Sequence, residues 1–404
     1  MKPDTFKDKK IIVGITGGIA AYKSCYLIRG LISRGADVKV IMTPSALQFI
    51  TPLTLSALSG NEVIVNIFPD NQQNGTSAGT WHIEYGLWAD LMIVAPATVN
   101  TIAKLSYGIT DNALTTVASA LRCPLIIAPA ADMDMYNSPA NMENLERLRK
   151  RDVFIVEGES GFLASGLTGP GRMAEVSKII DAAETVLSGI GTDLTGKKIL
   201  ITAGPTFEDI DPVRFIGNRS SGKMGYQIAK AAFLRGAEIT LISGPVNLPL
   251  YPEIKIQKVR SASEMQAAVK SNIKGKDILI MAAAVADYRP SEYASEKIKK
   301  EQKLKSITLV ENDDILKSLK VKSTKIIGFA LETENAVKNA FKKLDSKNLD
   351  MIILNIPDQA GSGFEFDTNK VTIIKKDKSQ TEYEIQSKFQ TANDILTEIK
   401  SLFL

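Results

Sequence analysis

The chain has 404 residues, of which 44% are hydrophobic and 23% are charged, and 49 basic and 45 acidic residues give a net charge of +4. This composition excludes a disordered chain, and the near balance of charge argues against nucleic acid as a partner, although it suits anionic small molecules. The length exceeds the size at which one hydrophobic core keeps growing, so two domains are expected.

The rare residue types narrow the class further. Cys25 and Cys123 lie in apolar stretches without a C-x-x-C pair, which predicts buried free thiols in a reducing compartment. The only histidine, His82, cannot build a multi-histidine metal site. No apolar run approaches the roughly 18 residues that span a bilayer, and the charged segment 1–10 does not resemble a signal peptide. We therefore expect a cytoplasmic protein without a membrane partner.

In the first half of the chain, short apolar runs alternate with segments of helical spacing. Strands are expected at residues 10–15, 38–42, 91–95, 124–128 and 153–156, and helices at 20–34, 100–105, 142–150 and 176–187. This alternation is typical of a parallel sheet covered by helices on both faces. Residues 70–80 have no apolar period and are expected to form a mobile loop.

A glycine-rich polar segment, 189–196, is expected to be a linker, after which the alternation restarts. Strands are expected at 198–202, 238–243, 277–282, 326–329 and 351–354, a helix at 221–235, a hairpin at 370–375 and 381–385, and a terminal helix at 392–403. The prediction is therefore α/β: two doubly wound, mostly parallel sheets, in domains 1–188 and 197–404. The two halves share this architecture but no obvious sequence repeat.

Three features of the first half predict a binding site. The glycine turn 14–20 joins the first strand to the first helix and would point backbone amides at an anion, although tight packing alone could also require glycines there. It is not a G-x-G-x-x-G fingerprint. Polar turns at 95–100 and 108–112 would lie at the strand ends where doubly wound sheets bind ligands. His82, between the two tryptophans, could transfer protons near neutral pH, although a lone histidine is more often structural.

Taken in order, these segments resemble the flavin-dependent phosphopantothenoylcysteine decarboxylases. The similarity rests on Gly-Ile-Thr-Gly-Gly-Ile-Ala-Ala-Tyr-Lys from Gly14, His-Ile-Glu-x-x-x-Trp-Ala-Asp from His82, Ala-Pro-Ala-Thr-x-Asn from Ala95, and segments 128–136 and 161–173. It covers about residues 9–187 and implies a flavodoxin-like flavoprotein domain.

The resemblance implies a chemistry and a set of site residues. In that family the substrate thiol is oxidised to a thioaldehyde with FMN as the electron acceptor, CO2 is lost, and the resulting enethiol is reduced again. The implied FMN-binding residues are Gly17, Gly18, Ile19, Thr43, Thr98 and Asn100. His82 is implied in the oxidation and decarboxylation, Asp132 and Tyr136 at the substrate carboxylate, and Arg172 in a covering flap.

Two positions depart from the family pattern. Relatives usually read Pro-Ala-Met-Asn where this chain ends in Asp132, and an ionised aspartate would repel a substrate carboxylate unless it is protonated or paired with a cation. Many relatives have a cysteine at Ser165 that donates the final proton, and a serine hydroxyl is a far weaker acid than a thiol, whose pKa is about 8.5. Our hypothesis is that protonated Asp132 or a water completes the step; alternatively, both residues vary together in an active subgroup.

The second half is polar and glycine-rich at 211–225 and contains G-x-x-x-x-G-K ending at Lys223. Met224 stands where a P-loop needs Ser or Thr, so we reject a P-loop, although backbone amides before a helix remain a good phosphate site. The small residues of 281–288 would let a base and ribose approach closely. The lysine-rich run 296–303 is either a solvated face or a cationic flap beside a nucleotide.

With 312–316, 328–333 and 343–350, these segments resemble phosphopantothenate–cysteine ligases over about 197–404 and imply a Rossmann-like ligase domain. Such ligases use CTP and Mg²⁺ to form an acyl-cytidylate, from which cysteine displaces CMP. Lys297 is implied in forming the acyl-cytidylate and Asn218 in the attack by cysteine. The remaining substrate-binding residues are expected to be Arg214, Asp287, Asp313, Asp314, Ile315, Leu316, Phe329, Lys343 and Lys347; no Mg²⁺ ligand is assigned.

The order of the two halves resembles the bifunctional bacterial enzymes of coenzyme A biosynthesis, which make 4′-phosphopantetheine from 4′-phosphopantothenate and cysteine. An alternative is an active ligase behind a flavin-binding regulatory or scaffold domain, and Ser165 and Asp132 keep it open. Two NAD-dependent dehydrogenase domains are disfavoured because neither half has G-x-G-x-x-G. The resemblance implies a homo-oligomer, with trimeric flavin domains and dimeric ligase domains that together would give a dodecamer. The residues alone leave CTP and ATP both open.

Overall fold

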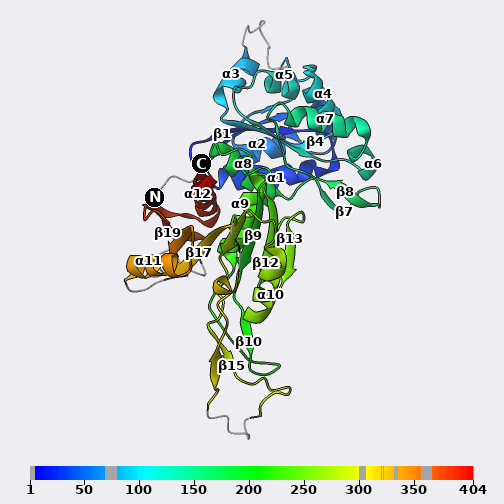
Figure 1. The fold of residues 1–404 in the computed structure, drawn as a ribbon. Coiled ribbons are helices and arrows are strands. Elements are labelled where there is room, and N and C mark those ends of the chain that lie inside the picture. Colours follow the sequence, from blue (N-terminus) through cyan, green and yellow to red (C-terminus); the bar gives the residue numbers. More distant parts are fainter. Residues whose placement is uncertain are drawn as a thin grey trace. The chain divides into compact units, whose positions relative to one another are not determined.

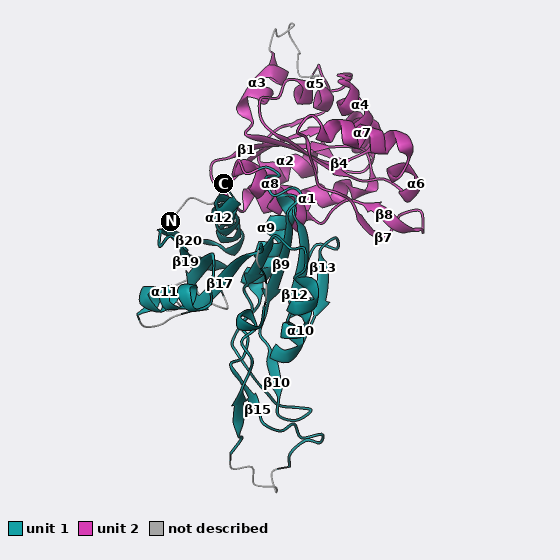
Figure 2. Ribbon diagram, viewed as in Figure 1, with its two compact units in different colours: residues 1–2, 191–404 teal, residues 3–190 magenta. Residues whose placement is uncertain are grey.

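The computed structural model describes residues 5–68, 80–299, 306–319, 321, 323–331, 335–355 and 366–403. The chain divides into two compact units between Ile190 and Gly191 (Figure 2), and each is described by itself. The predicted loop at 70–80 lies outside the described residues except for Thr80. Residues 300–303 of the lysine-rich run and residues 332 and 333 also lie outside them.

The N-terminal unit is built on a six-stranded parallel sheet of order β3-β2-β1-β4-β5-β6 (Figure 1). Its strands are β1 (Lys10–Ile15), β2 (Asp37–Met42), β3 (Val63–Ile64), β4 (Leu91–Ala97), β5 (Leu125–Pro129) and β6 (Phe154–Ile155). Every residue of β4 is buried, and because successive side chains point to opposite faces, both faces of the sheet are covered. The strand order reverses between β1 and β4, the switch point of a doubly wound sheet.

Helices and one hairpin complete this unit. The helices are η1 (Ile19–Tyr22), α1 (Lys23–Ile32), η2 (Pro44–Gln48), α2 (Pro52–Ser59), α3 (Trp81–Trp88), α4 (Val99–Tyr107), α5 (Ala113–Ser119), α6 (Met133–Tyr136), α7 (Pro139–Arg149) and α8 (Val176–Leu187). The hairpin pairs β7 (Glu159–Phe162) with β8 (Thr168–Arg172). Local signals start several helices: α7, for example, has Pro139 as its first residue and Ser138 as its N-cap, whose hydroxyl accepts the amide of Asn141.

The C-terminal unit contains an eight-stranded sheet of order β13-β12-β9-β14-β17-β18-β19-β20. The first six of these strands are parallel, and β19 and β20 add an antiparallel hairpin, as predicted. The strands are β9 (Lys198–Ala203), β12 (Glu238–Ser243), β13 (Lys255–Lys258), β14 (Ile278–Met281), β17 (Lys325–Leu331), β18 (Met351–Asn355), β19 (Thr368–Lys375) and β20 (Gln380–Ser387). Here the order reverses between β9 and β14, so the prediction of two doubly wound sheets is confirmed.

The helices of this unit are α9 (Lys223–Leu234), α10 (Ala262–Asn272), η4 (Leu316–Ser318), α11 (Ala336–Ser346), α12 (Lys388–Lys400) and η5 (Ser401–Phe403). Two short hairpins were not predicted: β10 (Phe207–Asp209) with β11 (Phe215–Gly217), and β15 (Tyr288–Pro290) with β16 (Leu309–Glu311). They lie next to each other and extend away from the eight-stranded sheet (Figure 1).

Two sequence-based expectations need correction. Most of the segment expected to be a linker, 189–196, is ordered as part of the C-terminal unit, where Leu194 is buried and Asp193 pairs with Arg235. Cys25 and Cys123 are free thiols, but both are half-buried instead of fully buried. Burial still raises the pKa of the Cys123 thiol to about 11. Within the described ranges, no helix combines the length and the apolar character needed to cross a bilayer.

Arg235 is a fully buried cation at the end of α9. Its guanidinium donates to both carboxylate oxygens of Asp193, at 2.8 and 2.9 Å, and to the main-chain oxygen of Asn393 in α12 at 2.8 Å. Burial alone would raise the pKa of Asp193, but the hydrogen bonds and charges of Arg235 and Lys400 outweigh it and lower that pKa. The pair therefore joins the start of the unit to both α9 and α12.

We expect Asp193→Ala to destabilise the C-terminal unit by about 3 kcal/mol, because it leaves the Arg235 cation buried without its carboxylate. Both tryptophans lie in the other unit, so hydrogen exchange of α9 and α12 amides under native conditions is the suitable measurement. Asp345→Asn, which removes an exposed pair with Lys378, should cost less than about 1 kcal/mol. Equal exchange in both variants would contradict a structural role for the buried pair.

Candidate functional sites

In the N-terminal unit, the loops after β1 and β4 are tied together by one buried hydroxyl. Thr16 Oγ1 donates to the main-chain oxygen of Pro96 at 2.7 Å and accepts the amide of Thr98 at 3.1 Å. Ser24 Oγ adds a bond to the main-chain oxygen of Ala95 at 2.7 Å. These bonds fix the two loops on either side of the switch point.

A third loop reaches the same place from β2. A Cβ built on Gly17 would lie 2.5 Å from Cβ of Ser45, so only glycine fits between the loops after β1 and β2. A Cβ on Gly18 would lie at an ordinary 3.6 Å from Cγ2 of Thr98. The three loops thus meet around Gly17, Gly18, Thr98 and the start of η2. We call these residues the cradle.

The cradle contains a buried polar group that a bound phosphate could satisfy. Thr43, directly before η2, is 7% exposed, and its Oγ1 has no hydrogen-bond partner among the described residues. A buried hydroxyl without a partner is costly, and a bound polar group would satisfy it. Ile19 and Asn100, also predicted here, are both exposed beside the cradle residues Gly18 and Thr98.

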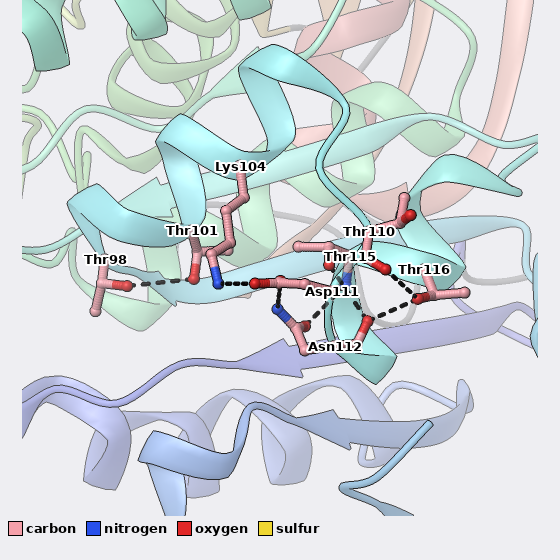
Figure 3. A network of polar contacts seen from close by, with 8 residues as sticks. All are labelled: Thr98, Thr101, Lys104, Thr110, Asp111, Asn112, Thr115 and Thr116. Atoms are coloured by element: carbon pink, nitrogen blue, oxygen red, sulfur yellow. Dashed lines mark hydrogen bonds and ion pairs between the residues drawn. The ribbon is translucent and has the colours of Figure 1, made fainter. Parts of the chain in front are cut away.

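A polar network holds the turn at 108–112 against α4 (Figure 3). Lys104 Nζ lies 2.7 Å from Oδ2 of Asp111, and this hydrogen bond is the main cause that lowers the pKa of Asp111. Asn112 donates to Asp111 and caps α5 by accepting the amide of Thr115 at 3.1 Å. The network therefore fixes α4, which begins after Thr98 of the cradle, relative to α5.

The segment with Asp132 lies under the hairpin β7–β8. The amide of Ala131 donates to Gly171 at 3.0 Å, and a Cβ on Gly171 would lie 2.2 Å from the Ala131 oxygen, so the two backbones are in close contact. Asp132 is half-buried directly before α6. Buried Tyr136 donates to Glu157 at 2.8 Å; burial and the Glu157 carboxylate raise the pKa of the Tyr136 phenol.

The other predicted residues of this unit lie on the hairpin β7–β8 and on α3. Ser165 is exposed in the turn of the hairpin, and Arg172, at its end, pairs with Glu175 at 3.4 Å. His82 lies on α3, where its ring makes an edge contact with Trp81 at 5.9 Å between centroids. Among the described residues of a single chain, no hydrogen bond brings His82 to the cradle or to Asp132.

The C-terminal unit encloses a cavity of about 830 Å³ at the carboxyl ends of β14, β17 and β18. The start of α9 forms part of its wall. This helix can lie close to the end of β9 because residue 225 is a glycine: an added Cβ would lie 2.6 Å from Cβ of Ala203. The loop after β14 is held by two threonines: Thr206 Oγ1 accepts the amide of Ala286 at 2.9 Å, and Thr202 Oγ1 that of Ala283 at 3.3 Å.

Most of the predicted ligase residues line this cavity. They are Asn218, Asp287, Asp313, Asp314, Ile315, Leu316, Phe329, Lys343 and Lys347. Asn218 Nδ2 donates to the Val285 oxygen at 2.9 Å. Lys347 lies 3.2 Å from Asp314. Burial alone would raise the pKa of Asp314, but the hydrogen bond and the charge of Lys347 outweigh burial and lower that pKa.

Lys297 and Arg214 are not part of the cavity wall. Arg214 donates to buried Asp211, and this contact is the main cause that lowers the pKa of Asp211 well below its usual range. Asp211 and Arg214 also hold Ile298, the residue next to Lys297. Asp211 accepts the amide of Ile298 at 3.2 Å, and Arg214 donates to the main-chain oxygen of Ile298 at 3.1 Å. Arg214 thus anchors the segment of Lys297, which is exposed.

The cavity also contains cations that the sequence did not suggest. Lys223 at the start of α9 and Lys388 at the start of α12 both line it, together with Asn369 of β19. Lys223 ends the G-x-x-x-x-G-K match that was rejected as a P-loop, and the one sequence signal for Lys388 is Ser387, an N-cap residue that places it at a helix start. Within the described ranges, no cluster of three or more His, Cys, Asp or Glu side chains could hold a metal ion.

Comparison with known families agrees with this division. Residues 2–188 match the family "Flavoprotein", and residues 194–403 match "DNA/pantothenate metabolism flavoprotein C-terminal domain". The Coenzyme A biosynthesis bifunctional protein CoaBC of Bacillus subtilis (strain 168) is 43% identical over 98% of this chain and 97% of its own. A cysteine/cysteine sulfinic acid decarboxylase from an unknown prokaryotic organism is 45% identical over 87% of this chain and 99% of its own. The crystal structure of the C-terminal domain of a CoaBC protein is 40% identical over 53% of this chain and 98% of its own, with a TM-score of 0.45.

The cradle makes a direct prediction for flavin binding. Gly17→Ala places a Cβ against Ser45 and should reduce the FMN content of the purified chain at least about tenfold, measured by absorbance near 450 nm after denaturation. Gly60→Ala is the control, because a Cβ added at Gly60 has nothing within 4 Å; the left-handed backbone of Gly60 at the end of α2 adds strain there but leaves the cradle untouched. A Gly17→Ala protein with full FMN content would contradict the assignment of the cradle as the FMN site.

Proposed function

The chain belongs to the family of bifunctional CoaBC proteins of coenzyme A biosynthesis, and we propose that it makes 4′-phosphopantetheine from 4′-phosphopantothenate, cysteine and CTP. The C-terminal unit would ligate cysteine, and the N-terminal unit would decarboxylate the product with FMN. The observation that carries the ligase assignment is the 830 Å³ cavity at the switch-point side of the second sheet, whose wall contains nine residues implied by the ligase resemblance.

In the ligase step, the phosphopantothenate carboxylate attacks the α-phosphorus of CTP and pyrophosphate leaves. The amine of cysteine then attacks the acyl carbon, and CMP leaves. Both steps build negative charge on phosphate oxygens, which fixed cations and a nucleotide-bound Mg²⁺ would stabilise. Lys343 and Lys347 face the cavity from α11 and its end. Asn218, whose amide nitrogen is held by the Val285 oxygen, would orient the attacking cysteine.

Lys297 would act from an exposed segment, not from the cavity wall. The backbone beside it is held at Ile298 by Asp211 and Arg214, so the segment that carries Lys297 is anchored while its side chain is exposed. Lysine is suited to this task because its compact charge on a long stem can follow a phosphate. We therefore assign Lys297 to stabilising the phosphates during acyl-cytidylate formation.

The N-terminal unit fits FMN on two observations: the buried Thr43 hydroxyl, which has no partner in the described part of the chain, and the three-loop cradle that excludes a side chain at Gly17. Gly17, Gly18, Ile19, Thr43, Thr98 and Asn100 would hold its phosphate end. Bound FMN supplies an electron acceptor and donor for the substrate thiol. In the same site His82 would take the thiol proton, and Asp132 and Tyr136, under the hairpin, would position the substrate carboxylate.

His82 lies on α3, outside the three loops that form the cradle, and a second copy of the chain could bring its imidazole there. We propose that the N-terminal units form trimers, so that His82 acts at the cradle of a neighbouring copy, and that the C-terminal units form dimers. We also place the enzyme in the cytoplasm, since both cysteines are free thiols, as is usual in a reducing compartment. Sedimentation of the full chain tests the assembly.

The alternative is a ligase whose flavin-binding unit is regulatory or a scaffold. One assay separates the two: phosphopantothenate, cysteine and CTP are given to the purified chain, and phosphopantothenoylcysteine, CO2 and phosphopantetheine are followed together. Accumulation of phosphopantothenoylcysteine without CO2 would favour the alternative. Cysteine alone as the substrate tests the activity in the name of the cysteine decarboxylase relative.

We expect Lys297→Gln to lower pyrophosphate release at least about hundredfold, because the phosphates lose a cation where charge develops. The release is measured in the presence of both CTP and phosphopantothenate. Lys274→Gln removes an exposed lysine of the same unit and should leave the rate unchanged. A Lys297→Gln enzyme of normal rate would remove Lys297 from the reaction.

Ser165→Ala should change the rate of phosphopantetheine formation less than about threefold, because a serine hydroxyl is too weak an acid to deliver the final proton. We assign that proton to Asp132 or a water, so Asp132→Ala should be slower by a larger factor. Mass spectrometry of the products follows the oxidised enethiol. Its accumulation with Ser165→Ala but not with Asp132→Ala would reverse the assignment.

A further inference from the structure

Two lysines that have no role in the reaction described above meet at the cavity from distant parts of the chain. Lys223 is the first residue of α9 and Lys388 the first residue of α12, and the two helices pack against each other. Both side chains line the cavity. We call Lys223 and Lys388 the lysine pair.

The two ammonium groups are held differently. Lys388 is 5% exposed, and its Nζ donates to the main-chain oxygen of Phe366. Lys223 Nζ lies 2.7 Å from Oδ1 of Asp367, a carboxylate whose side chain is 89% exposed. Lys388 is therefore a buried ammonium that lies near a second ammonium group, that of Lys223, in the cavity wall.

The charges around Lys388 favour an anionic ligand. Burial is the main cause that lowers the pKa of Lys388 to about 8; the charge of Lys223 from α9 lowers it further, while Asp367, before β19, acts in the opposite direction. The ammonium groups of Lys223 and Lys388 therefore repel each other in the cavity wall. A ligand with several negative charges between the two would remove that repulsion, whereas a neutral ligand would not.

The backbone next to the lysine pair has the polarity that phosphates need. α9 is 12 residues long, and the amides of its first turn have no partner within the helix, so the positive end of its dipole faces the cavity at Lys223. Gly222, the N-cap, has φ of 73°, and an added Cβ would lie 3.2 Å from Cα of Gly204, so the backbone here is closely packed. The first turn of α9 and the two lysines thus line the same cavity.

We propose that the lysine pair holds the β- and γ-phosphates of the nucleotide, the part that leaves as pyrophosphate; the inference rests on the ligase function proposed above. A carboxylate oxygen of the substrate forms a bond to the α-phosphorus, and the bond from that phosphorus to the bridging oxygen breaks. The bridging oxygen keeps the electron pair and leaves on pyrophosphate. Cations at the β-phosphate stabilise the charge that develops there.

The proposal predicts proton uptake on binding. Phosphates next to Lys388 favour its charged form and raise its pKa, so near pH 8.5 the complex holds more protons than the free protein and its free ligand. Affinity for pyrophosphate should accordingly fall as the pH rises above 8. CMP has neither the β- nor the γ-phosphate, and its binding should take up no proton at Lys388.

Calorimetric titration of the full chain at pH 8.5, in two buffers of different ionisation enthalpy, measures affinity and proton uptake together. With the unsubstituted chain, pyrophosphate and CTP should each take up a substantial part of a proton, and CMP none. Lys388→Gln should weaken pyrophosphate and CTP about tenfold to hundredfold and leave CMP unchanged. Lys388→Arg should keep most of the affinity but abolish the uptake, because arginine does not deprotonate. Lys255→Gln, on the exposed edge strand β13, should change nothing.

The outcomes separate this inference from the ligase proposal. If CTP and pyrophosphate do not bind the unsubstituted chain at all, the ligase proposal fails and the inference with it. If both bind but Lys388→Gln binds them equally well, or loses CMP to the same extent, only the inference is overturned. Should Lys388→Gln fail to fold, the comparison of proton uptake between the unsubstituted chain and Lys388→Arg decides: equal uptake overturns the inference.

Discussion

Both sites depend on buried threonine hydroxyls that join the two loops at the switch point of a doubly wound sheet. In the N-terminal unit Thr16, just after β1, binds the main chain at Pro96 and Thr98 beyond β4. In the C-terminal unit Thr202 and Thr206, at and after β9, accept amides from the loop after β14. A doubly wound sheet opens a crevice where the strand order reverses, and the loops on either side of this crevice are rigid only if hydrogen bonds join them. The two units meet this need with the same kind of bond, although their sequences share no obvious repeat.

The same constraint has different consequences in the two units. In the first, three loops converge so closely that Gly17 cannot carry a side chain, which leaves a small cradle of backbone amides and one unpaired hydroxyl. That suits the phosphate end of a tightly bound cofactor, while His82 lies on α3, outside these three loops. In the second, the loops enclose a cavity of about 830 Å³, large enough for a nucleotide and an acyl acceptor together. The loops at the two switch points thus form a small cradle suited to a cofactor in one unit and a large cavity suited to substrates in the other.

Periodicity predicted the central strands because a buried parallel strand is a continuous apolar run, as in β1 and β12. It did not predict α3, since Gly86 disfavours a helix; the structure needs that glycine, because an added Cβ would lie 2.5 Å from the Ala120 oxygen. The hairpins β10–β11 and β15–β16 have strands of three residues, too short to show alternation. Arg214 was expected at the substrate from its motif, but its partner Asp211 is only three residues away, and motif position alone does not reveal that contact.

Lys388 could not have been found by residue type, since a lysine near the chain end normally belongs to a solvated face. Its position becomes significant only when α12 packs on α9 and brings it beside Lys223. The cavity then shows a common pattern: Lys347 is paired with Asp314 at 3.2 Å and Lys223 with Asp367 at 2.7 Å. Each carboxylate holds its lysine side chain in place, yet is itself partly or largely exposed, so incoming phosphates can compete for the same cation at small cost. Such an exchange of partners would leave the cations of the cavity wall in place while the ligand changes.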